Sequence, residues 1–345
     1  MLSFTLKTYL GVFLFLLSLT GLVINVVVLL PVFRLAFIFK KSPIYVISMV
    51  NISIDLINLT LATFYLAPSI IFESNIFGET KDAKVPKILG SIFMFCWYMG
   101  SITQMIMALN RLVVIYFRRN DLFTRRNILI VFVMITPICL FLMYMAQYGF
   151  PCCAFVFDHD VLSYSYFQID DLPNYPNHII DLPLNISSSS IAVICYSLIV
   201  WTVRKSTRGI EASLSNMQNR RSRRNRELAY AMQFCFISMF YTFSWICFRI
   251  FPPLIGTHGV EWFISISIAV TINSSANAVV YLITNQEVRK YLVFSRSAFF
   301  KRPAETSSNI NHSTDAPRST GVSSESKICA TAVCLANNRH KKNLV

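Results

Sequence analysis

Seven long stretches of apolar residues, separated by shorter polar gaps, run along the chain from its N-terminus to about residue 283. Each stretch reaches or exceeds the ~20 residues that an α-helix needs to cross the hydrocarbon core of a bilayer. Backbone polar groups in lipid must be satisfied inside the protein, so the stretches are expected to be helices. The sequence therefore predicts an all-α membrane protein, a seven-transmembrane helix bundle, with spans at about 8–33, 43–66, 87–117, 127–150, 178–203, 227–251 and 260–283.

The basic residues fall almost entirely in alternate gaps. Gaps 34–42, 111–126 and 204–226 hold three, five and eight Lys or Arg residues, and the segment after 283 holds ten, which makes 26 of the 31. Loops rich in Lys and Arg stay in the cytoplasm, so we expect the N-terminus outside and the C-terminus inside. The formal net charge of +14 then reflects orientation beside an anionic inner leaflet and does not indicate a nucleic-acid partner.

The composition divides the chain into two parts. Charged residues make up 14% and hydrophobic residues 54%, whereas soluble globular chains carry about 25% charged residues. The first apolar run, from Tyr9 to Phe33, is too long for the core of a cleaved signal peptide, so we expect it to remain as a span. We assign residues 1–295 to the membrane domain and residues 296–345, rich in Ser, Thr and Asn, to a disordered cytoplasmic tail.

The gap 151–177 has the features of a lid on the outer side. It contains four Asp and no Lys or Arg, and aromatic residues alternate with others between Phe155 and Phe167. This alternation is typical of a short β-hairpin, but a solvated loop with interfacial aromatic residues explains it equally well. Cys152 and Cys153 lie on the side where disulfides form, and no cysteine stands at the outer end of the 87–117 stretch to pair with them.

Few polar groups lie inside the spans, where an ionisable group costs about 2.5–3.5 kcal/mol or more. Asp55 lies in the middle of the 43–66 stretch, and Asn25, Asn273 and Asn277 fall at a similar depth. They are predicted to form a polar hub around Asp55, with water or a monovalent cation, that repacks on activation. Plain hydrogen bonding between helices accounts for the same residues. No other cofactor and no metal site are expected.

Two opposite charges are expected at the inner membrane face. Arg111 lies near the end of the 87–117 stretch, and Glu227 opens the 227–251 stretch just after the basic run 220–224. That run is expected to continue the helix into the cytosol. The two side chains form either a latch between their helices or two unrelated interfacial charges.

Another group of charges is expected at the outer face. Arg249 follows Trp245 by one helical turn, and Asp181 and Glu261 lie at the same outer level. An arginine facing an internal cavity would bind a carboxylate ligand or one of these acids. An arginine that snorkels to the outer headgroups is the alternative. The first alternative predicts an acidic or carbonyl-bearing ligand.

Six short motifs stand in order along these spans. They are Gly21-x-x-x-Asn25, Asp55, Ala108-Leu-Asn-Arg111, Tyr241-x-x-x-Trp245, Asn277-Ala-Val-Val-Tyr281 and Asn285-Gln-Glu-Val-Arg289, the last opening a short amphipathic helix at 285–294. Over about residues 10–295 this arrangement resembles the rhodopsin-like G-protein-coupled receptors, and in particular the nematode serpentine chemoreceptor class Srx. The loop segment 152–158 also looks like that class.

The resemblance implies roles for these positions. Arg111 would be the switch at the inner face, Glu227 its partner in the inactive state, and Tyr281 a ring that swings inward on activation. Trp245 would form the floor of the ligand pocket and Arg249 part of its wall. The protein would be a plasma-membrane chemosensory receptor that binds a small extracellular ligand and activates a heterotrimeric G protein. A receptor kinase and arrestin would act through the tail.

The sequence departs from the family pattern at several positions. Asn110 replaces the acid that usually precedes the switch arginine, so the basal restraint is expected to be weaker. Cys247 and Ala278 stand where prolines are usual. The outer cysteine of the 87–117 stretch is missing, which leaves the usual outer-loop disulfide without one of its partners.

A ligand-gated channel or transporter of the same topology is the alternative function. Such proteins usually carry internal repeats, broken helices or a charge-lined pore, and none of these is evident. An enzyme is not expected, because the sequence contains neither His-Glu-x-x-His nor Gly-x-Ser-x-Gly. The 260–283 stretch also lacks a Lys that could bind retinal as a Schiff base.

Overall fold

The computed structural model of the protein describes residues 4–78, 83–119, 121–166, 172–208, 218–255 and 259–292. Its helices and strands are α1 (Phe4–Phe33), η1 (Arg34–Ile38), α2 (Ile44–Leu61), η2 (Ala62–Leu66), α3 (Ala67–Phe72), α4 (Lys84–Ile115), α5 (Arg125–Tyr144), η3 (Met145–Gly149), β1 (Phe155–Asp158), β2 (Ser163–Tyr166), η4 (Pro176–Asp181), α6 (Leu182–Arg208), α7 (Gln218–Ile255), η5 (Val260–Phe263) and α8 (Ile264–Thr284). Residues 286–292 are also helical. The tail predicted at 296–345 lies outside the described residues.

Within the described residues, consecutive helical segments join into seven helices that are long and apolar enough to span a membrane, which confirms the predicted number. The second of them continues from Ile44 to Phe72, six residues beyond the predicted end. Its last turns include Pro68, which lies in the first turn of α3, where the missing N–H of a proline costs little. The helix ends at Glu73, whose φ of 49° is left-handed. Helix α7 begins at Gln218, so the basic run before 227 is helical, as predicted.

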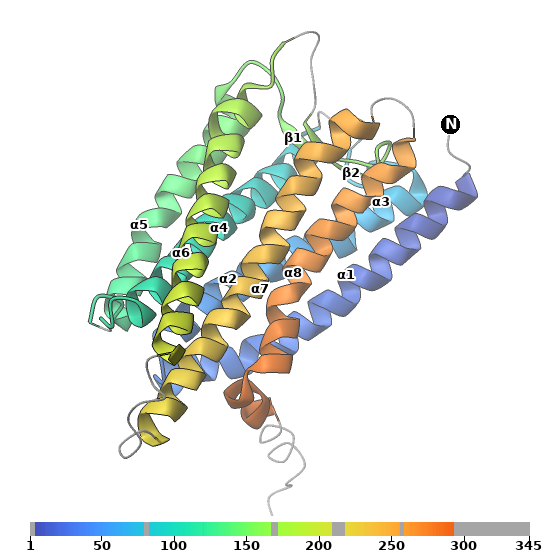
Figure 1. Cartoon of the computed structure of the whole chain (residues 1–345). Coiled ribbons are helices and arrows are strands. Elements are labelled where there is room, and N and C mark those ends of the chain that lie inside the picture. Colours follow the sequence, from blue (N-terminus) through green and yellow to red (C-terminus); the bar gives the residue numbers. More distant parts are fainter. Residues whose placement is uncertain are drawn as a thin grey trace, which may run out of the picture. The chain divides into compact units, whose positions relative to one another are not determined.

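The helices α2, α4 and α8 form the interior of the bundle, because their spans are the most buried. Helix α4 contacts α2, α5, α6 and α7, and α8 contacts α1, α2 and α7. Helices α1 and α5 stand at opposite sides in Figure 1, and the span containing α5 is the least buried. Residues from α2, α4, α7 and α8 therefore point into a shared interior.

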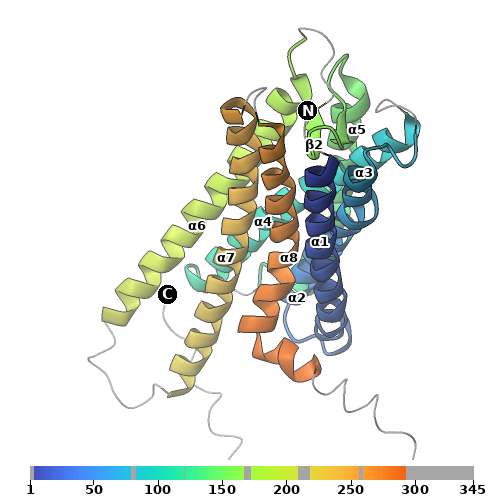
Figure 2. The ribbon, with the colours of Figure 1, turned by 90° about the vertical axis from the view of Figure 1, so that its right-hand side faces the viewer.

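The loop predicted to lie on the outer side forms a two-stranded antiparallel hairpin in which Phe155 pairs with Tyr166 and Asp158 pairs with Ser163. The end of the bundle that carries this hairpin is called the outer end, after the predicted orientation, and the opposite end is called the inner end. Figures 1 and 2 show the hairpin at the end of the bundle where α1 begins, while the short helix after α8 lies at the opposite end. The hairpin contacts α4 through β1 and α8 through β2. All four residues of β1 are buried. The hairpin alternative is therefore confirmed, and the solvated loop is wrong.

Candidate functional site

Aromatic rings from the hairpin fill the space between α4 and α7 at the outer end. The Phe93 ring of α4 stacks on Tyr164 at 4.5 Å and on Phe155 at 5.1 Å between ring centroids. On the α7 side, Phe248 contacts Tyr164 at 6.0 Å and Trp97 at 5.6 Å. Because the rings pack at the distances typical of aromatic pairs, the hairpin acts as a plug in the outer mouth of the bundle.

One buried amide holds this plug in place. Gln147 of η3 accepts a hydrogen bond from the Phe155 N–H at 2.6 Å, and its amide nitrogen donates to the Phe155 carbonyl at 3.0 Å. The same nitrogen lies 3.2 Å from the Lys87 carbonyl of α4. A Cβ atom at Gly90 would lie only 2.1 Å from the Phe155 carbonyl oxygen, so the close approach of hairpin and α4 requires glycine.

The two outer cysteines form a disulfide with each other. The sequence left their pairing open, because α4 carries no cysteine near its outer end. Both are buried, and Cys153 has a left-handed φ of 81°. With Cys152 and Cys153 joined to each other, the described contacts that hold the start of the hairpin at α4 are those of Gln147, Gly90 and the Phe93 ring.

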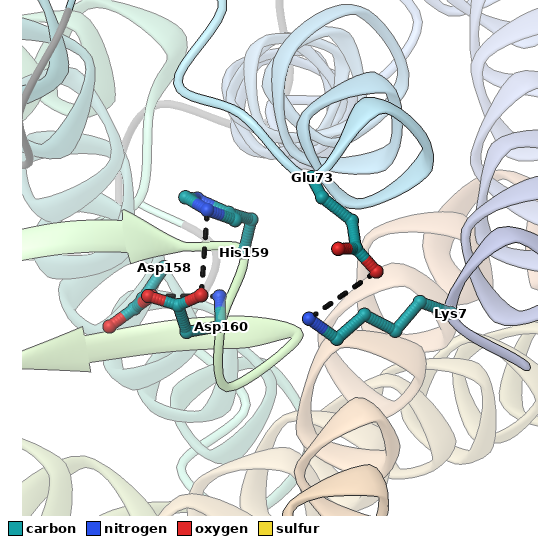
Figure 3. Close-up of polar contacts among 5 residues, drawn as sticks. All are labelled: Lys7, Glu73, Asp158, His159 and Asp160. Atoms are coloured by element: carbon teal, nitrogen blue, oxygen red, sulfur yellow. Dashed lines mark hydrogen bonds and ion pairs between the residues drawn. The ribbon is translucent and has the colours of Figure 1, made fainter. Parts of the chain in front are cut away.

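A polar rim surrounds the hairpin turn. Figure 3 shows Lys7 of α1 pointing toward Glu73 at the end of α3, with 3.5 Å between Nζ and Oε1. In the turn, the His159 Nε2 lies 3.5 Å from an Asp160 oxygen. The backbone N–H of Asp160 donates to the Asp158 carboxylate at 2.9 Å. These contacts tie the first helix to the end of the second span and close the hairpin turn.

Arg249 is half-buried and does not reach either predicted acid at ion-pair distance within the described part of the chain. Its guanidinium donates to the Asn177 side-chain oxygen at 3.1 Å. Asp181 lies close enough to share an electrostatic interaction with Arg249, but accepts its hydrogen bond from the Asn185 amide at 2.8 Å. Glu261 lies in η5 and forms no ion pair with Arg249 among the described residues. The prediction of an Arg249–acid contact thus holds only as an attraction to Asp181.

Donors without acceptors are found around this arginine. The Tyr98 hydroxyl and the Trp245 indole N–H are buried and have no hydrogen-bond partner among the described residues. Burial is the main reason why the pKa of Tyr166 is well above its ordinary value, and Asp181 and Tyr98 raise it further. Tyr166 therefore remains a neutral hydroxyl beside Asp181, and the region has a surplus of groups that can donate.

A hydrogen-bond network below the aromatic cluster joins α4, α6 and α7, and sequence reasoning missed most of it. The Tyr241 hydroxyl bonds to both Ser101 and Asn185. Ser188 donates to the Ser101 carbonyl at 2.8 Å. Because Asn185 also holds Asp181, the network connects the outer charged residues to the middle of the bundle. Its members are small polar residues that look like ordinary helix contacts in a sequence.

The predicted hub is only partly assembled. Asn277 of α8 donates to the Asp55 carboxylate of α2. Asn25 instead donates to the Ser274 carbonyl at 3.1 Å and to the Gly21 carbonyl at 2.9 Å, so it holds α1 against α8. Asp55, Asn273 and Asn277 line a small cavity of about 20 Å³. A polar cavity of this size is large enough for one water-sized occupant.

The inner end contains a chain of contacts around Arg111. This buried residue places its guanidinium carbon 5.1 Å from the centre of the Phe234 ring of α7. Phe234 meets the Tyr281 ring of α8 edge-on at 6.2 Å, and the Tyr281 hydroxyl bonds to Ser48 of α2. Four helices therefore meet there. The side chain of Glu227 lies outside the described residues, so the predicted latch stays a prediction.

The helix after α8 docks against the start of α2. Asn285 accepts hydrogen bonds from the N–H groups of Glu287 and Val288 at 3.0 and 3.1 Å, which caps that helix. The Tyr45 hydroxyl donates to Glu287 at 2.7 Å. The Tyr291 ring stacks on Phe39 at 4.8 Å. The sequence predicted this helix from residue 285 to 294, and its described part agrees.

A second, larger hollow of about 480 Å³ lies between α5 and α6, away from these polar groups. Its walls are apolar side chains such as Phe141, Ile180 and Leu184. Binding sites usually contain a few polar groups that orient a ligand. This hollow has almost none, so the polar outer end near Arg249 is the better candidate.

The described residues thus form a seven-transmembrane bundle with a hairpin plug at one end and the buried Arg111 near the other. The chain belongs to the family described as serpentine type 7TM GPCR chemoreceptor Srx, which it matches over residues 15–285. Among solved structures it is similar to squid rhodopsin, with a TM-score of 0.70, 16% sequence identity, and 86% of this chain and 87% of that chain covered. That similarity shows the fold alone. No curated protein matches the sequence.

Family membership confirms several of the sequence predictions. The protein is a multi-pass membrane receptor of the chemosensory G-protein-coupled class. Such receptors bind a small molecule and couple to a G protein, and the alternative of a channel or transporter has no support. The family and the fold are those of receptors rather than enzymes.

Proposed function

We propose that this receptor lies in the plasma membrane with its N-terminus outside, binds an acidic or carbonyl-bearing ligand beside Arg249, and activates a heterotrimeric G protein around Arg111. The alternation of basic gaps supports this orientation. The hairpin and Arg249 then belong to the extracellular end, and Arg111 belongs to the cytoplasmic end. The hydrogen-bond network of Ser101, Asn185 and Tyr241 runs from Asp181 beside Arg249 to the middle of the bundle.

One observation carries the ligand proposal: a half-buried arginine bonds to a neutral amide while neighbouring donors lack acceptors. Arg249 donates a hydrogen bond to Asn177, and the Tyr98 hydroxyl and Trp245 N–H have no partner among the described residues. A carboxylate or carbonyl oxygen supplies the missing acceptor, and a carboxylate can bind a guanidinium through two parallel hydrogen bonds. Aromatic rings such as Phe248 would enclose the apolar part of the ligand.

The test replaces Arg249 with Gln, which keeps a donor but removes the charge. We expect an acidic agonist to lose roughly 10- to 150-fold in potency, because a hydrogen bond to a charged group is worth about 1.5–3 kcal/mol. The matched control is Glu261→Gln, which removes a charge from the same outer level without touching Arg249. An acidic agonist with equal potency on the wild type and on Arg249→Gln would exclude the proposed contact.

The G-protein end is proposed from Arg111, Glu227 and Tyr281. Arg111 and Tyr281 both touch Phe234 of α7, so outward movement of the inner end of α7 would release them together. Arg111→Ala is expected to bind ligand normally and to lose agonist-driven nucleotide exchange. A receptor kinase and arrestin are proposed to act on the serines and threonines of 296–345.

A monovalent cation is proposed in the cavity beside Asp55. The cavity is lined by oxygen-bearing side chains, and the side-chain oxygens of Asn58 and Asn277 have no described hydrogen-bond partner. Hard cations prefer such carboxylate and amide oxygens. Sodium chloride should raise the melting temperature of the purified receptor above its value in choline chloride. The difference should vanish in Asp55→Asn, and an equal difference in that variant would contradict the site.

A further inference from the structure

The contact between Arg111 and Phe234 joins two helices that must separate if the inner end of the receptor opens. Arg111 is 3% exposed and Phe234 1% exposed, so water is excluded from the contact. A guanidinium over an aromatic face is attracted to it, most strongly when both groups are desolvated. At 5.1 Å the charge lies within the range in which this attraction acts.

Phe234 also contacts Tyr281, the second residue that is proposed to move when the inner end opens. Its ring meets Tyr281 at an interplanar angle of 69°, the edge-to-face arrangement that aromatic pairs favour. The Tyr281 hydroxyl is in turn bonded to Ser48. A single side chain of α7 thus holds α4 through a charge and α8 through a ring, and α8 holds α2 through a hydroxyl.

We infer that Phe234 is the positioning residue that keeps this receptor inactive, because its ring holds the Arg111 charge and the Tyr281 ring at the same time. This inference rests on the proposed role of Arg111. When α7 moves away from α4, the cation–π contact and the edge contact must break together. The ring therefore couples the two inner switch residues, and its loss favours the open state.

The position of Phe234 makes this role independent of any contact made by Glu227. Phe234 follows Glu227 by seven residues, which is two turns of α7, so Phe234 lies deeper in the span than position 227. Asn110 stands where a neighbouring acid is usual in the family. A second restraint on Arg111, made by Phe234 deeper in the bundle, is therefore useful in this chain whatever other contacts Arg111 makes.

The first test compares Phe234→Leu with Phe236→Leu. Leucine keeps most of the apolar volume but has no aromatic face. Phe236 lies two residues away on the same helix with 47% of its surface exposed, so it controls for the loss of a ring alone. Fluorophores introduced as non-natural amino acids at Leu122 and Met232, both exposed, report the separation of the inner ends by energy transfer, without a G protein or a ligand.

Phe234→Leu should raise the ratio of open to closed receptor by about 2- to 30-fold, the range of a cation–π contact at exposed to desolvated sites. Phe236→Leu should leave the ratio unchanged. In a double-mutant cycle, Arg111→Gln should have a clearly smaller effect in the Phe234→Leu background than in the wild type. Equal effects in both backgrounds, or an unchanged ratio in Phe234→Leu, overturn the inference.

A second series keeps the fold while weakening only the π face. Phenylalanine with one, two or three fluorine atoms at position 234 should increase the open fraction stepwise, because fluorine withdraws electron density from the ring. An open fraction that does not depend on fluorination overturns the cation–π role even if Phe234→Leu misfolds. Failure of the proposed G-protein function is distinguishable, because it would abolish nucleotide exchange without changing the energy-transfer results.

Discussion

Replacing Gln147 with Leu should loosen the hairpin plug without changing the helices. Leucine has nearly the same size but cannot hydrogen-bond, so both the N–H and the carbonyl of Phe155 lose their side-chain partner. Phe155 is buried, and each buried group left unsatisfied costs about 1–3 kcal/mol. The two groups together should lower the free energy of hairpin opening by about 2–6 kcal/mol, or roughly 30- to 20,000-fold in the opening equilibrium.

Amide hydrogen exchange followed by mass spectrometry measures that equilibrium directly, because the hairpin amides exchange when it opens locally. Peptides covering 153–166 should exchange faster in Gln147→Leu, while peptides from α8 should not change. Gly90→Ala should act in the same direction, because its Cβ would overlap the Phe155 carbonyl. Gly100→Ala is its control, since a Cβ there has no neighbour within 4 Å. Wild-type exchange rates in both Gln147→Leu and Gly90→Ala would refute the proposed anchoring.

Three further predictions concern other parts of the bundle. Gly21→Ala should lower the melting temperature by several degrees, because its Cβ would lie 2.1 Å from the Ser275 hydroxyl; an unchanged melting curve would show that α1 and α8 need no such close approach. In choline chloride, where no sodium offsets the buried carboxyl group, Asp55→Asn should stabilise the ligand-free receptor, because it keeps a group that can bond to Asn277, and a lower melting temperature there would argue against this. Burial raises the pKa of Tyr164, so hairpin docking should weaken as the pH rises past about 10, where an undocked tyrosine ionises; hydrogen exchange that shows equal protection of the hairpin at pH 9 and pH 11, after correction for intrinsic rates, would contradict this.

The bundle could be predicted from the sequence because the bilayer imposes one simple requirement. A span must be long and apolar, so hydropathy alone located seven helices. Their ends were less certain. The second span was predicted to end at about residue 66, but the helix continues past Pro68, because a proline in the first turn of a new helical segment does not end the helix. The sequence cannot show where one helical segment continues directly into the next.

The site was predicted in part, and the errors have a common cause. Asp55 and Asn277 were placed together because a buried charge requires a partner. Asn25 was assigned to the same group, yet it donates to the Ser274 backbone carbonyl. Every residue has a backbone carbonyl, so the sequence cannot indicate which one a side chain will bond to. Phe234 was overlooked because an aromatic residue in a membrane helix looks like any other apolar residue. Its significance comes only from Arg111, whose guanidinium lies over the Phe234 ring.

The hairpin could not be distinguished from a solvated loop by the sequence alone. The alternation of aromatic residues favoured a hairpin and a solvated loop equally. Gly90 and Gln147 decide the matter in the structure, because they let the Phe155 backbone approach α4 and satisfy its polar groups. A glycine and a glutamine facing each other across two helices carry no recognisable motif. The sequence likewise left the pairing of Cys152 and Cys153 open, and the structure shows that they form a disulfide with each other.

The central claim is that a ligand bound at the outer end drives a G protein at the inner end through Arg111. The most direct test is a screen of small organic acids and carbonyl compounds against the purified receptor in lipid nanodiscs, with heterotrimeric G proteins and nucleotide exchange as the readout. Wild-type receptor should raise exchange with an agonist, whereas Arg111→Ala should bind that agonist with similar affinity and raise none. Equal exchange from both receptors, or a bound ligand that never raises exchange with any G protein, would contradict the claim.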